Sequence, residues 1–127
     1  MAYYLFADKM MRGEAIDLFG RGQLRRDFTY IDDIVDGIVG ALHCPKGFGV
    51  YNLGNHRAES VESLVVCLET ALQCKARVRM VDRPTEDMIE TYADIRRAAE
   101  DFGYSPKVGL AEGISRFASW YRSYVLV

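Results

Sequence analysis

Residues 25–33 read Arg-Arg-Asp-Phe-Thr-Tyr-Ile-Asp-Asp, and the rest of the chain is organised around this stretch. Two cations lead into residues 28–31, whose aromatic and β-branched side chains favour extended backbone. The double aspartate then opens an apolar helix. Asp32 or Asp33 is expected as its N-cap, and Asp36 adds negative charge to its first turn. The sequence therefore predicts cationic charge at a strand end that a capped helix holds in place.

Helical and extended patterns alternate along the whole chain. Apolar spacing of the helical kind predicts five helices, over about 3–11, 33–42, 60–72, 94–102 and 110–121. Short strands are predicted over 15–19, 28–31, 49–54 and 77–80. Ser60 and Asp94 are expected to cap the third and fourth helices, and Gly103 to end the fourth. The fold class is α/β, a small mixed domain of short strands and about five helices.

Apolar side chains form stripes on these helices and are expected to be buried. The stripe of the second helix is Ile34, Val35, Ile38, Val39 and Leu42, and that of the third is Val61, Leu64, Val65, Leu68 and Leu72. Val78 and Met80 alternate with arginines, as in a half-buried strand. The stripes on the first two helices could instead pack on protein outside this chain. Left exposed, they would favour self-association.

Length and composition indicate a single globular domain over residues 1–127. The net charge of −2 gives no reason to expect a nucleic-acid partner. No apolar run approaches the roughly 18 residues of a membrane span, and no signal peptide is visible, so a cytoplasmic protein without a membrane partner is expected. Three cysteines without a Cys-x-x-Cys pair are interpreted as reduced core thiols, and their spacing to the histidines fits no common zinc site.

The start of the chain departs from the usual pattern of a complete domain. Met1 is followed almost at once by the apolar stripe of the first helix, with no capping residue before it. The expectation is that the sequence begins inside a longer protein.

The chain carries none of the motifs that would complete an active site. Gly20 and Gly22 lack the third glycine of a dinucleotide-binding fingerprint, and no P-loop, Gly-x-Ser-x-Gly elbow or His-Glu-x-x-His helix occurs. His43 and His56 are isolated, which favours structural or solvated roles. No catalytic residue is therefore predicted in this chain.

A binding site is the alternative that the residues support. Arg26 precedes a strand, Arg83 lies in a polar loop, and Phe19 ends a strand beside a glycine turn. Two guanidinium groups that can fork onto phosphate oxygens, together with an aromatic face for a base, suit a nucleoside diphosphate. Residue types alone also allow the ordinary reading of surface arginines and a core phenylalanine.

Four collinear stretches resemble the C-terminal half of the NAD-dependent epimerase/dehydratase family, the extended short-chain dehydrogenases that act on nucleotide sugars. They are residues 16–37, residues 51–54, residues 83–94 and residues 102–121. The first is most similar to UDP-glucuronate 4-epimerases. The later loop, 82–87, looks more like that of sugar-nucleotide dehydratases, and Glu86 places a negative charge near the proposed phosphate site.

The resemblance implies a role for four side chains. Phe19 would lie against the uracil ring, Arg26 and Arg83 would contact the diphosphate, and Asp87 would reach the ribose hydroxyls. Asp33 and Asn52 also match recurrent family positions, where a helix cap and a turn are the expected roles.

The family's chemistry would come from outside this chain. NAD in the parent enzyme would take a hydride from C4 of the UDP-sugar and return it to the opposite face. The glycine-rich NAD loop and the Tyr-x-x-x-Lys pair of the family are missing here, so both belong to an N-terminal Rossmann half. This chain alone is predicted to be inactive, with that half and a UDP-sugar as partners, and a homodimer is left open. Two alternatives also stay open: a fragment of a 4,6-dehydratase or decarboxylase, and a non-catalytic nucleotide- or protein-binding module.

Overall fold

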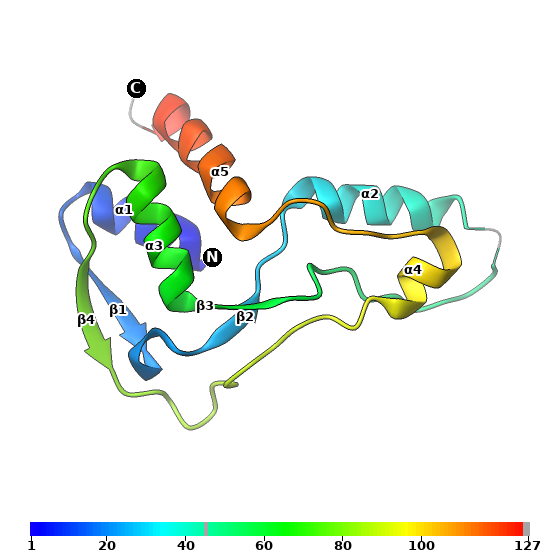
Figure 1. The fold of residues 1–127 in the computed structure, drawn as a ribbon, viewed down its shortest axis with the longest axis horizontal. Coiled ribbons are helices and arrows are strands. Elements are labelled where there is room, and N and C mark those ends of the chain that lie inside the picture. The colour runs from blue at the N-terminus through cyan, green and yellow to red at the C-terminus, as the bar shows by residue number, and fades with distance from the viewer. Residues whose placement is uncertain (45, 126–127) are drawn as a thin grey trace.

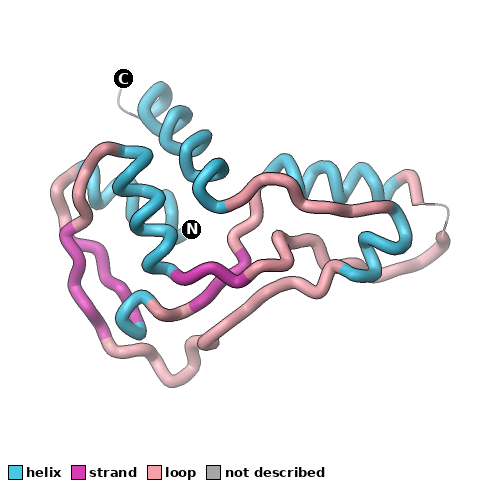
Figure 2. The backbone as a smooth tube through the Cα atoms, viewed as in Figure 1, coloured by secondary structure: helices cyan, strands magenta, loops and turns pink. Residues whose placement is uncertain are grey.

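The computed structural model describes residues 1–44 and 46–125. Within them the chain forms five α-helices and four short strands (Figures 1 and 2). In order they are α1 (Ala2–Met11), β1 (Ala15–Phe19), a short 3₁₀ turn η1 (Gly20–Gly22), β2 (Arg25–Asp27), α2 (Ile31–Leu42), β3 (Ala58–Ser60), α3 (Val61–Leu72), β4 (Arg77–Val81), α4 (Arg96–Phe102) and α5 (Leu110–Val125). The predicted α/β class is confirmed.

One end of the molecule is a packed lobe built from α1, β1, α3, β4 and α5, here called the core lobe (residues 1–24, 61–81 and 110–125; Figure 1). Its core consists of Phe6, Ala7, Met10, Ile16, Leu18, Leu64, Val65, Leu68, Leu72, Ile114, Ala118 and Tyr121. The predicted stripe of α3 is confirmed, since four of its members are buried in this core. Ser60 caps α3 as predicted, because its hydroxyl accepts the backbone N–H of Ser63 at 3.0 Å.

The two strands of this lobe run parallel, with Ala15 opposite Arg77 and Phe19 opposite Val81. Ile16 and Leu18 of β1 point into the core. Val78 and Met80 of β4 remain 41% and 60% exposed, so the predicted half-buried strand is a strand but is not half-buried. The reason is that the core covers β1, whereas β4 lies on the outer side of a sheet only two strands wide.

The other end of the molecule is an extended arm (residues 31–57 and 93–108) in which α2 lies beside α4 (Figure 1). Much of the arm is irregular chain (Figure 2). Its small buried cluster contains only Ile95, Ala98 and Tyr104, with a few partly buried neighbours. Gly103 ends α4 in the left-handed conformation, as predicted.

The face of α2 that packs against the rest of the arm is not its apolar stripe. Only Asp33 and Gly37 of α2 are buried. A Cβ atom at Gly37 would lie 2.8 Å from Leu53, and one at Gly40 would lie 2.8 Å from the Phe102 ring. The two glycines therefore let the aromatic and apolar side chains of the arm approach the α2 backbone closely.

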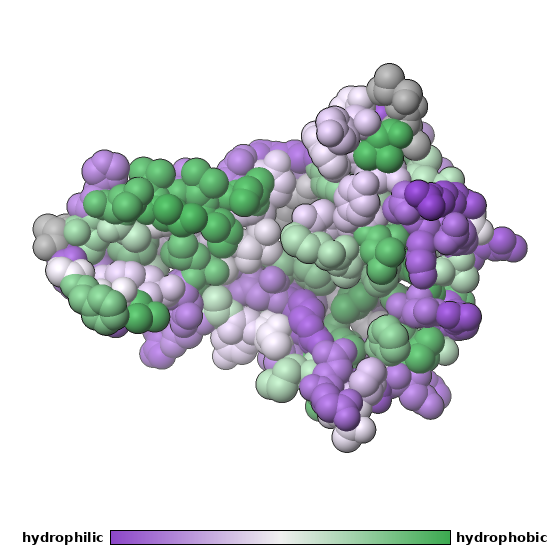
Figure 3. Space-filling model, turned by 180° about the vertical axis from the view of Figure 1, so that it is seen from behind, coloured by the Kyte–Doolittle hydropathy of each residue, from purple (hydrophilic) through white to green (hydrophobic). Residues whose placement is uncertain are grey.

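The predicted burial of the α2 stripe is consequently wrong for this chain. Val35, Ile38 and Val39 are about half exposed, and Leu42 is 78% exposed. Figure 3 shows the result as a band of hydrophobic surface over α2. The helix turns its glycines inward and its branched apolar side chains outward.

Three local predictions, at the start of α2 and in the loop that follows this helix, are also wrong. The N-cap of α2 is Tyr30, without a side-chain hydrogen bond, rather than Asp32 or Asp33. Residues 49–54 form no strand, because no neighbouring strand lies beside them in the part of the chain that the structure describes. The predicted strand at 28–31 is displaced toward the two arginines, since β2 covers Arg25–Asp27 and Ile31 already belongs to α2. No helix among the described residues is long and apolar enough to cross a membrane.

Candidate functional site

The polar loop at 82–90 is fixed beside β2 by backbone hydrogen bonds to Arg25. The Arg25 amide donates to the Ile89 carbonyl at 2.8 Å, and the Thr91 amide donates to the Arg25 carbonyl at 3.1 Å. On its other side β2 pairs antiparallel with β3. The Arg25 side chain adds an ion pair with Glu90 at 2.8 Å. The loop is thus held against the strand that carries Arg26.

Arg26 meets Asp87 across this junction. One guanidinium nitrogen donates to Asp87 Oδ1 at 2.6 Å, and another donates to the Arg25 carbonyl at 2.8 Å. Both side chains are partly exposed, so the pair lies at the surface where a ligand can reach it. Two of the predicted binding residues are therefore in direct contact.

Arg83 joins the same group through the backbone of the loop. Its Nη1 donates to the Asp87 carbonyl at 2.5 Å and lies within 3.4 Å of the Pro84 and Thr85 carbonyls. The Asp87 amide in turn donates to the Pro84 carbonyl at 3.1 Å. Arg83 therefore shapes the turn that presents Asp87 to Arg26.

Phe19 lies at the carboxyl end of β1, at the same sheet edge as the start of this loop. It is paired in register with Val81, two residues before Arg83, and its side chain is 41% exposed. A Cβ atom at Gly20 would lie 3.6 Å from the Arg83 Cβ, so the glycine turn and Arg83 are adjacent. The structure thus links Arg26, Arg83 and Asp87 through contacts and leaves Phe19 at the neighbouring strand end.

Asp27 organises the region behind the site, and its role was not anticipated from the sequence. Its Oδ1 accepts the Asn55 amide at 2.8 Å and the Thr29 hydroxyl at 3.2 Å. Its Oδ2 accepts the amides of His56 at 3.2 Å and Ala93 at 2.9 Å. One carboxylate therefore ties β2 to two distant segments. No local sequence signal marked this role, because the partners Asn55 and Ala93 lie 28 and 66 residues further along the chain.

Asp33 also acts through long-range contacts. Its carboxylate is only 3% exposed and accepts the amides of Lys107 at 2.9 Å and Val108 at 3.0 Å. It therefore anchors the segment between α4 and α5 instead of capping α2. The structural role expected for Asp33 holds, but the structure that it stabilises is a different one.

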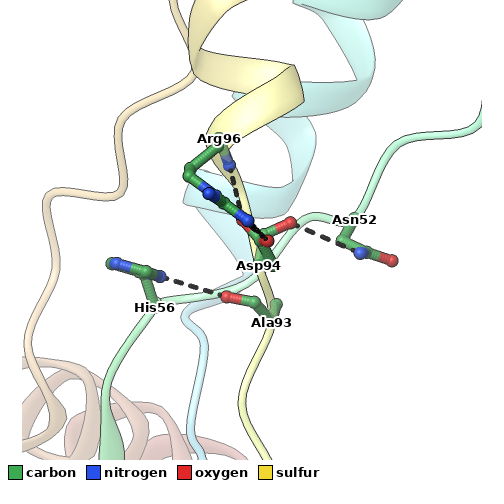
Figure 4. A network of polar contacts seen from close by, with 5 residues as sticks. All are labelled: Asn52, His56, Ala93, Asp94 and Arg96. Atoms are coloured by element: carbon green, nitrogen blue, oxygen red, sulfur yellow. Dashed lines mark hydrogen bonds and ion pairs between the residues drawn. The ribbon is translucent and has the colours of Figure 1, made fainter.

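A polar network beside the Asp27 cluster holds the start of α4 (Figure 4). Asn52 donates to the Asp94 carbonyl at 3.3 Å, and His56 Nδ1 lies 3.2 Å from the Ala93 carbonyl and must donate to it. Asp94 lies one residue before the N-cap Ile95 and accepts the Arg96 amide at 3.1 Å. The hydrogen-bonded Arg96 guanidinium lowers the pKa of Asp94 to about 2.

A second polar cluster lies at the far end of the arm. The Tyr51 hydroxyl donates to Asp101 at 2.8 Å, and Lys46 pairs with the same carboxylate. The hydrogen bond to this anion raises the pKa of Tyr51 to about 12, because ionising the phenol would place two negative charges side by side. These contacts fasten the loop before β3 onto α4.

A cleft of about 900 Å³ opens between α1, the segment leading into α2, and α5. Its lining is mainly apolar and includes Tyr3, Phe117 and Trp120. Arg26 and Arg116 also line it, and the Arg116 guanidinium lies 5.1 Å above the Tyr30 ring. Arg26 is therefore the residue that the cleft shares with the Asp87 loop.

The glycine turn after β1 and the metal-binding residue types bear on the binding of a dinucleotide and of a metal ion. Gly20 and Gly22 belong to η1, a turn between β1 and β2 rather than a strand-to-helix entry, so they do not form an NAD-binding loop. Among residues 1–44 and 46–125 there is no group of three or more side chains that could hold a metal ion.

Comparison with known proteins shows which family this chain is similar to. Residues 2–54 match the model of the NAD dependent epimerase/dehydratase family. UDP-glucuronate 4-epimerase 6 of Arabidopsis thaliana is 39% identical over 141 residues, an alignment that covers 98% of this chain and 31% of the relative. An uncharacterized protein of Methanocaldococcus jannaschii is 36% identical over 121 residues, covering 95% and 37%. The family whose model matches residues 2–54 is the one that the motifs of this chain resemble.

Solved structures of similar proteins have the same fold as this chain over most of its length. UDP-glucuronic acid 4-epimerase from Bacillus cereus, in complex with UDP-glucuronic acid and NAD, superposes with a TM-score of 0.88 at 30% identity. The superposition covers 97% of this chain and 40% of that enzyme. The chain therefore spans about a third of the length of its curated relatives and two-fifths of this solved structure.

Proposed function

We propose that this chain is the nucleotide-sugar-binding portion of an NAD-dependent UDP-sugar 4-epimerase, with UDP-glucuronate as its sugar nucleotide. The whole of residues 1–127 serves as this portion. The parent enzyme is an isomerase that inverts the configuration at C4 of the sugar, and it works in the cytoplasm.

The observation that carries the proposal is the group of Arg26, Arg83 and Asp87 beside the exposed Phe19. Cationic, aromatic and carboxylate side chains come together from β1, β2 and the loop after β4. A diphosphate, a base and a ribose require these three kinds of group. The similarity to 4-epimerases supports the same ligand class.

The role of this portion would be to grip the UDP end of the substrate. Arg26 and Arg83 contact the diphosphate, Asp87 reaches the ribose, and Phe19 stacks on the uracil. Binding energy obtained far from the reacting carbon can then position the sugar. NAD and the catalytic base are supplied by the rest of the parent enzyme, since this sequence carries neither a glycine-rich NAD loop nor a Tyr-x-x-x-Lys pair.

The remaining part of the parent enzyme would cover the apolar surface that this chain exposes. The cleft and the α2 stripe meet at Ile31 and Ile34, which line the cleft and begin α2. The relatives are more than twice as long as this chain, so a further portion of sufficient size exists in them. A Rossmann half docked here would cover both surfaces.

Isothermal titration calorimetry of UDP-glucuronate tests the proposed ligand and the role of Arg26. Arg26→Ala is expected to weaken binding by about 1.5–3 kcal/mol, because a charge-assisted hydrogen bond is lost. Arg79→Ala is the matched control, since Arg79 pairs with Asp17 on the β1–β4 sheet. An unchanged affinity in Arg26→Ala would remove this residue from the site.

Comparing ligands separates the proposal from its alternatives. The epimerase reading requires UDP-glucuronate to bind more tightly than dTDP-glucose or GDP-mannose. The reverse order would favour a dehydratase fragment, and no binding of any of the three would favour a non-catalytic module. The 127-residue chain is expected to show no epimerase activity, and NAD-dependent turnover by the purified chain would contradict the assignment of the chemistry to another part.

A further inference from the structure

Arg26 and Asp87 form an ion pair, although the proposed function has each of them bind a different part of the ligand. Arg26 is assigned to the diphosphate and Asp87 to the ribose, yet the two side chains bind each other at 2.6 Å. We infer that Asp87 determines specificity by occupying Arg26, so that the site accepts a nucleoside diphosphate and rejects inorganic anions. This inference rests on the proposed function and deepens it.

The geometry restricts how the pair can open. The Arg26 guanidinium is held from a second side by its bond to the Arg25 carbonyl. The Asp87 backbone is held at two atoms: its carbonyl accepts a hydrogen bond from Arg83 Nη1, and its amide donates to the Pro84 carbonyl. With both supports in place, the carboxylate can leave Arg26 by rotation of its own side chain, without movement of the loop.

An anion that approaches Arg26 therefore has to displace or share the Asp87 carboxylate. If Asp87 stays, two negative groups lie on one guanidinium and repel each other. If Asp87 leaves, it loses a charge-assisted hydrogen bond, and a bare anion gives it nothing in return. A nucleotide differs because its ribose hydroxyls can donate hydrogen bonds to the released Asp87 carboxylate. The exchange is then favourable for a nucleotide and unfavourable for pyrophosphate.

The test is a comparison of inorganic pyrophosphate and UDP binding to the whole chain by calorimetry. Asp87→Asn is expected to bind pyrophosphate about tenfold more tightly than the wild type, the size of one charge-assisted contact, and to bind UDP no more tightly. The ratio of UDP to pyrophosphate affinity should therefore fall by about tenfold. Asp87→Glu, which keeps the charge, should retain weak pyrophosphate binding.

Glu86→Gln is the matched control. It removes the same charge from the adjacent, exposed residue of the same loop, whereas the guanidinium contact of Arg26 is with Asp87. Glu86→Gln should leave the ratio of UDP to pyrophosphate affinity within about twofold of the wild type. The variant removes only a solvent-screened, longer-range repulsion between Glu86 and the anion. Equal gains in pyrophosphate affinity for Glu86→Gln and Asp87→Asn would overturn the inference.

The outcomes also separate this inference from the proposed function. If UDP binds the wild type but Asp87→Asn gains no pyrophosphate affinity, the specificity role is wrong and the nucleotide site remains. If UDP does not bind while Asp87→Asn gains pyrophosphate affinity, the nucleotide site is wrong, and Asp87 is an anion competitor only. Circular dichroism melting of each variant establishes that the compared proteins are folded.

Discussion

The core lobe and the arm hold together by different forces. In the core lobe, apolar side chains from three helices and β1 pack into one continuous cluster. In the arm, the buried apolar cluster is small, and its backbone is fixed by amide hydrogen bonds to the carboxylates of Asp33 and of Asp27 on the adjoining strand β2. The strongest apolar stripe of the arm, on α2, faces outward.

This difference indicates which part of the chain is suited to contact another protein surface. A lobe that buries its own stripes is stabilised by burial that stays within the chain. In the arm, hydrogen bonds from backbone amides to carboxylates hold the shape of the chain. The apolar stripe of α2 is therefore left exposed and available for contact with another surface. Three of the predicted binding residues, Arg26, Arg83 and Asp87, lie between the two parts, at β2 and the loop after β4.

The largest expected effect is in the core lobe. Leu64→Ala should lower the free energy of unfolding by about 2–5 kcal/mol, because Leu64 is fully buried in the core and its removal leaves a cavity. Val39→Ala on the exposed stripe of α2 is the control and should stay within about 0.5 kcal/mol. Urea unfolding measures both. Similar losses in the two variants would mean that the α2 stripe is buried in solution.

Breaking a polar anchor of the arm should have a smaller effect. Asp33→Ala leaves the amides of Lys107 and Val108, the latter buried, without their acceptor and should cost about 2 kcal/mol. Asp33→Asn keeps one side-chain oxygen and should cost less. The measurement is again urea unfolding, supplemented by hydrogen exchange at residues 107 and 108. Unchanged exchange in Asp33→Ala would show that this carboxylate does not hold the segment.

The exposed stripe should affect association more than stability. Ile38→Lys should raise the concentration at which the isolated chain self-associates by about tenfold, because one buried isoleucine contributes on the order of 1.5–3 kcal/mol. Val66→Lys places the same charge at an exposed apolar residue of α3 and should change association little. Light scattering over a concentration series compares them. A wild-type chain that stays monomeric at high concentration would contradict the prediction.

The smallest effect concerns the acid stability of the network in Figure 4. The pKa of Asp94 is lower in the folded protein, at about 2, than its ordinary value of 3.8, so the unfolded chain binds this proton first. The contribution of Asp94 is therefore complete above about pH 4 and is lost as the pH falls toward 2. Asp94→Asn and Arg96→Gln should both flatten this part of a plot of melting temperature against pH. An unchanged slope in both variants would remove the pair from acid unfolding.

Local rules predicted those elements whose stability comes from their own sequence. The cap at Ser60 and the stop at Gly103 each depend on residues within one or two turns, and both were found as expected. The same rules failed for α2, because the burial of a helix face depends on what lies next to it. Gly37 and Gly40 read as interruptions of a helix, yet they form its packed face.

The candidate site was predictable as a set of residue types but not as an arrangement. Arg26 and Arg83 could be named from their charge and position, and Asp87 from the resemblance to the family. The contact between Arg26 and Asp87 depends on the backbone pairing of Arg25 with residues 89–91. Such pairing between distant segments leaves no mark in local sequence. The hydrogen bonds of Asp27 were missed for the same reason.

The parallel pairing of β1 with β4 also has a consequence for how the chain folds. Because Ala15 lies opposite Arg77, this contact closes a long loop that contains η1, β2, α2, β3 and α3. Closing such a loop is slow, whereas its entropic cost changes by only about 0.6 kcal/mol for each doubling of its length. The core lobe should therefore tolerate shortening or lengthening of the segment between α2 and β3 with little loss of equilibrium stability. The rate of folding should depend on how soon the two strands meet.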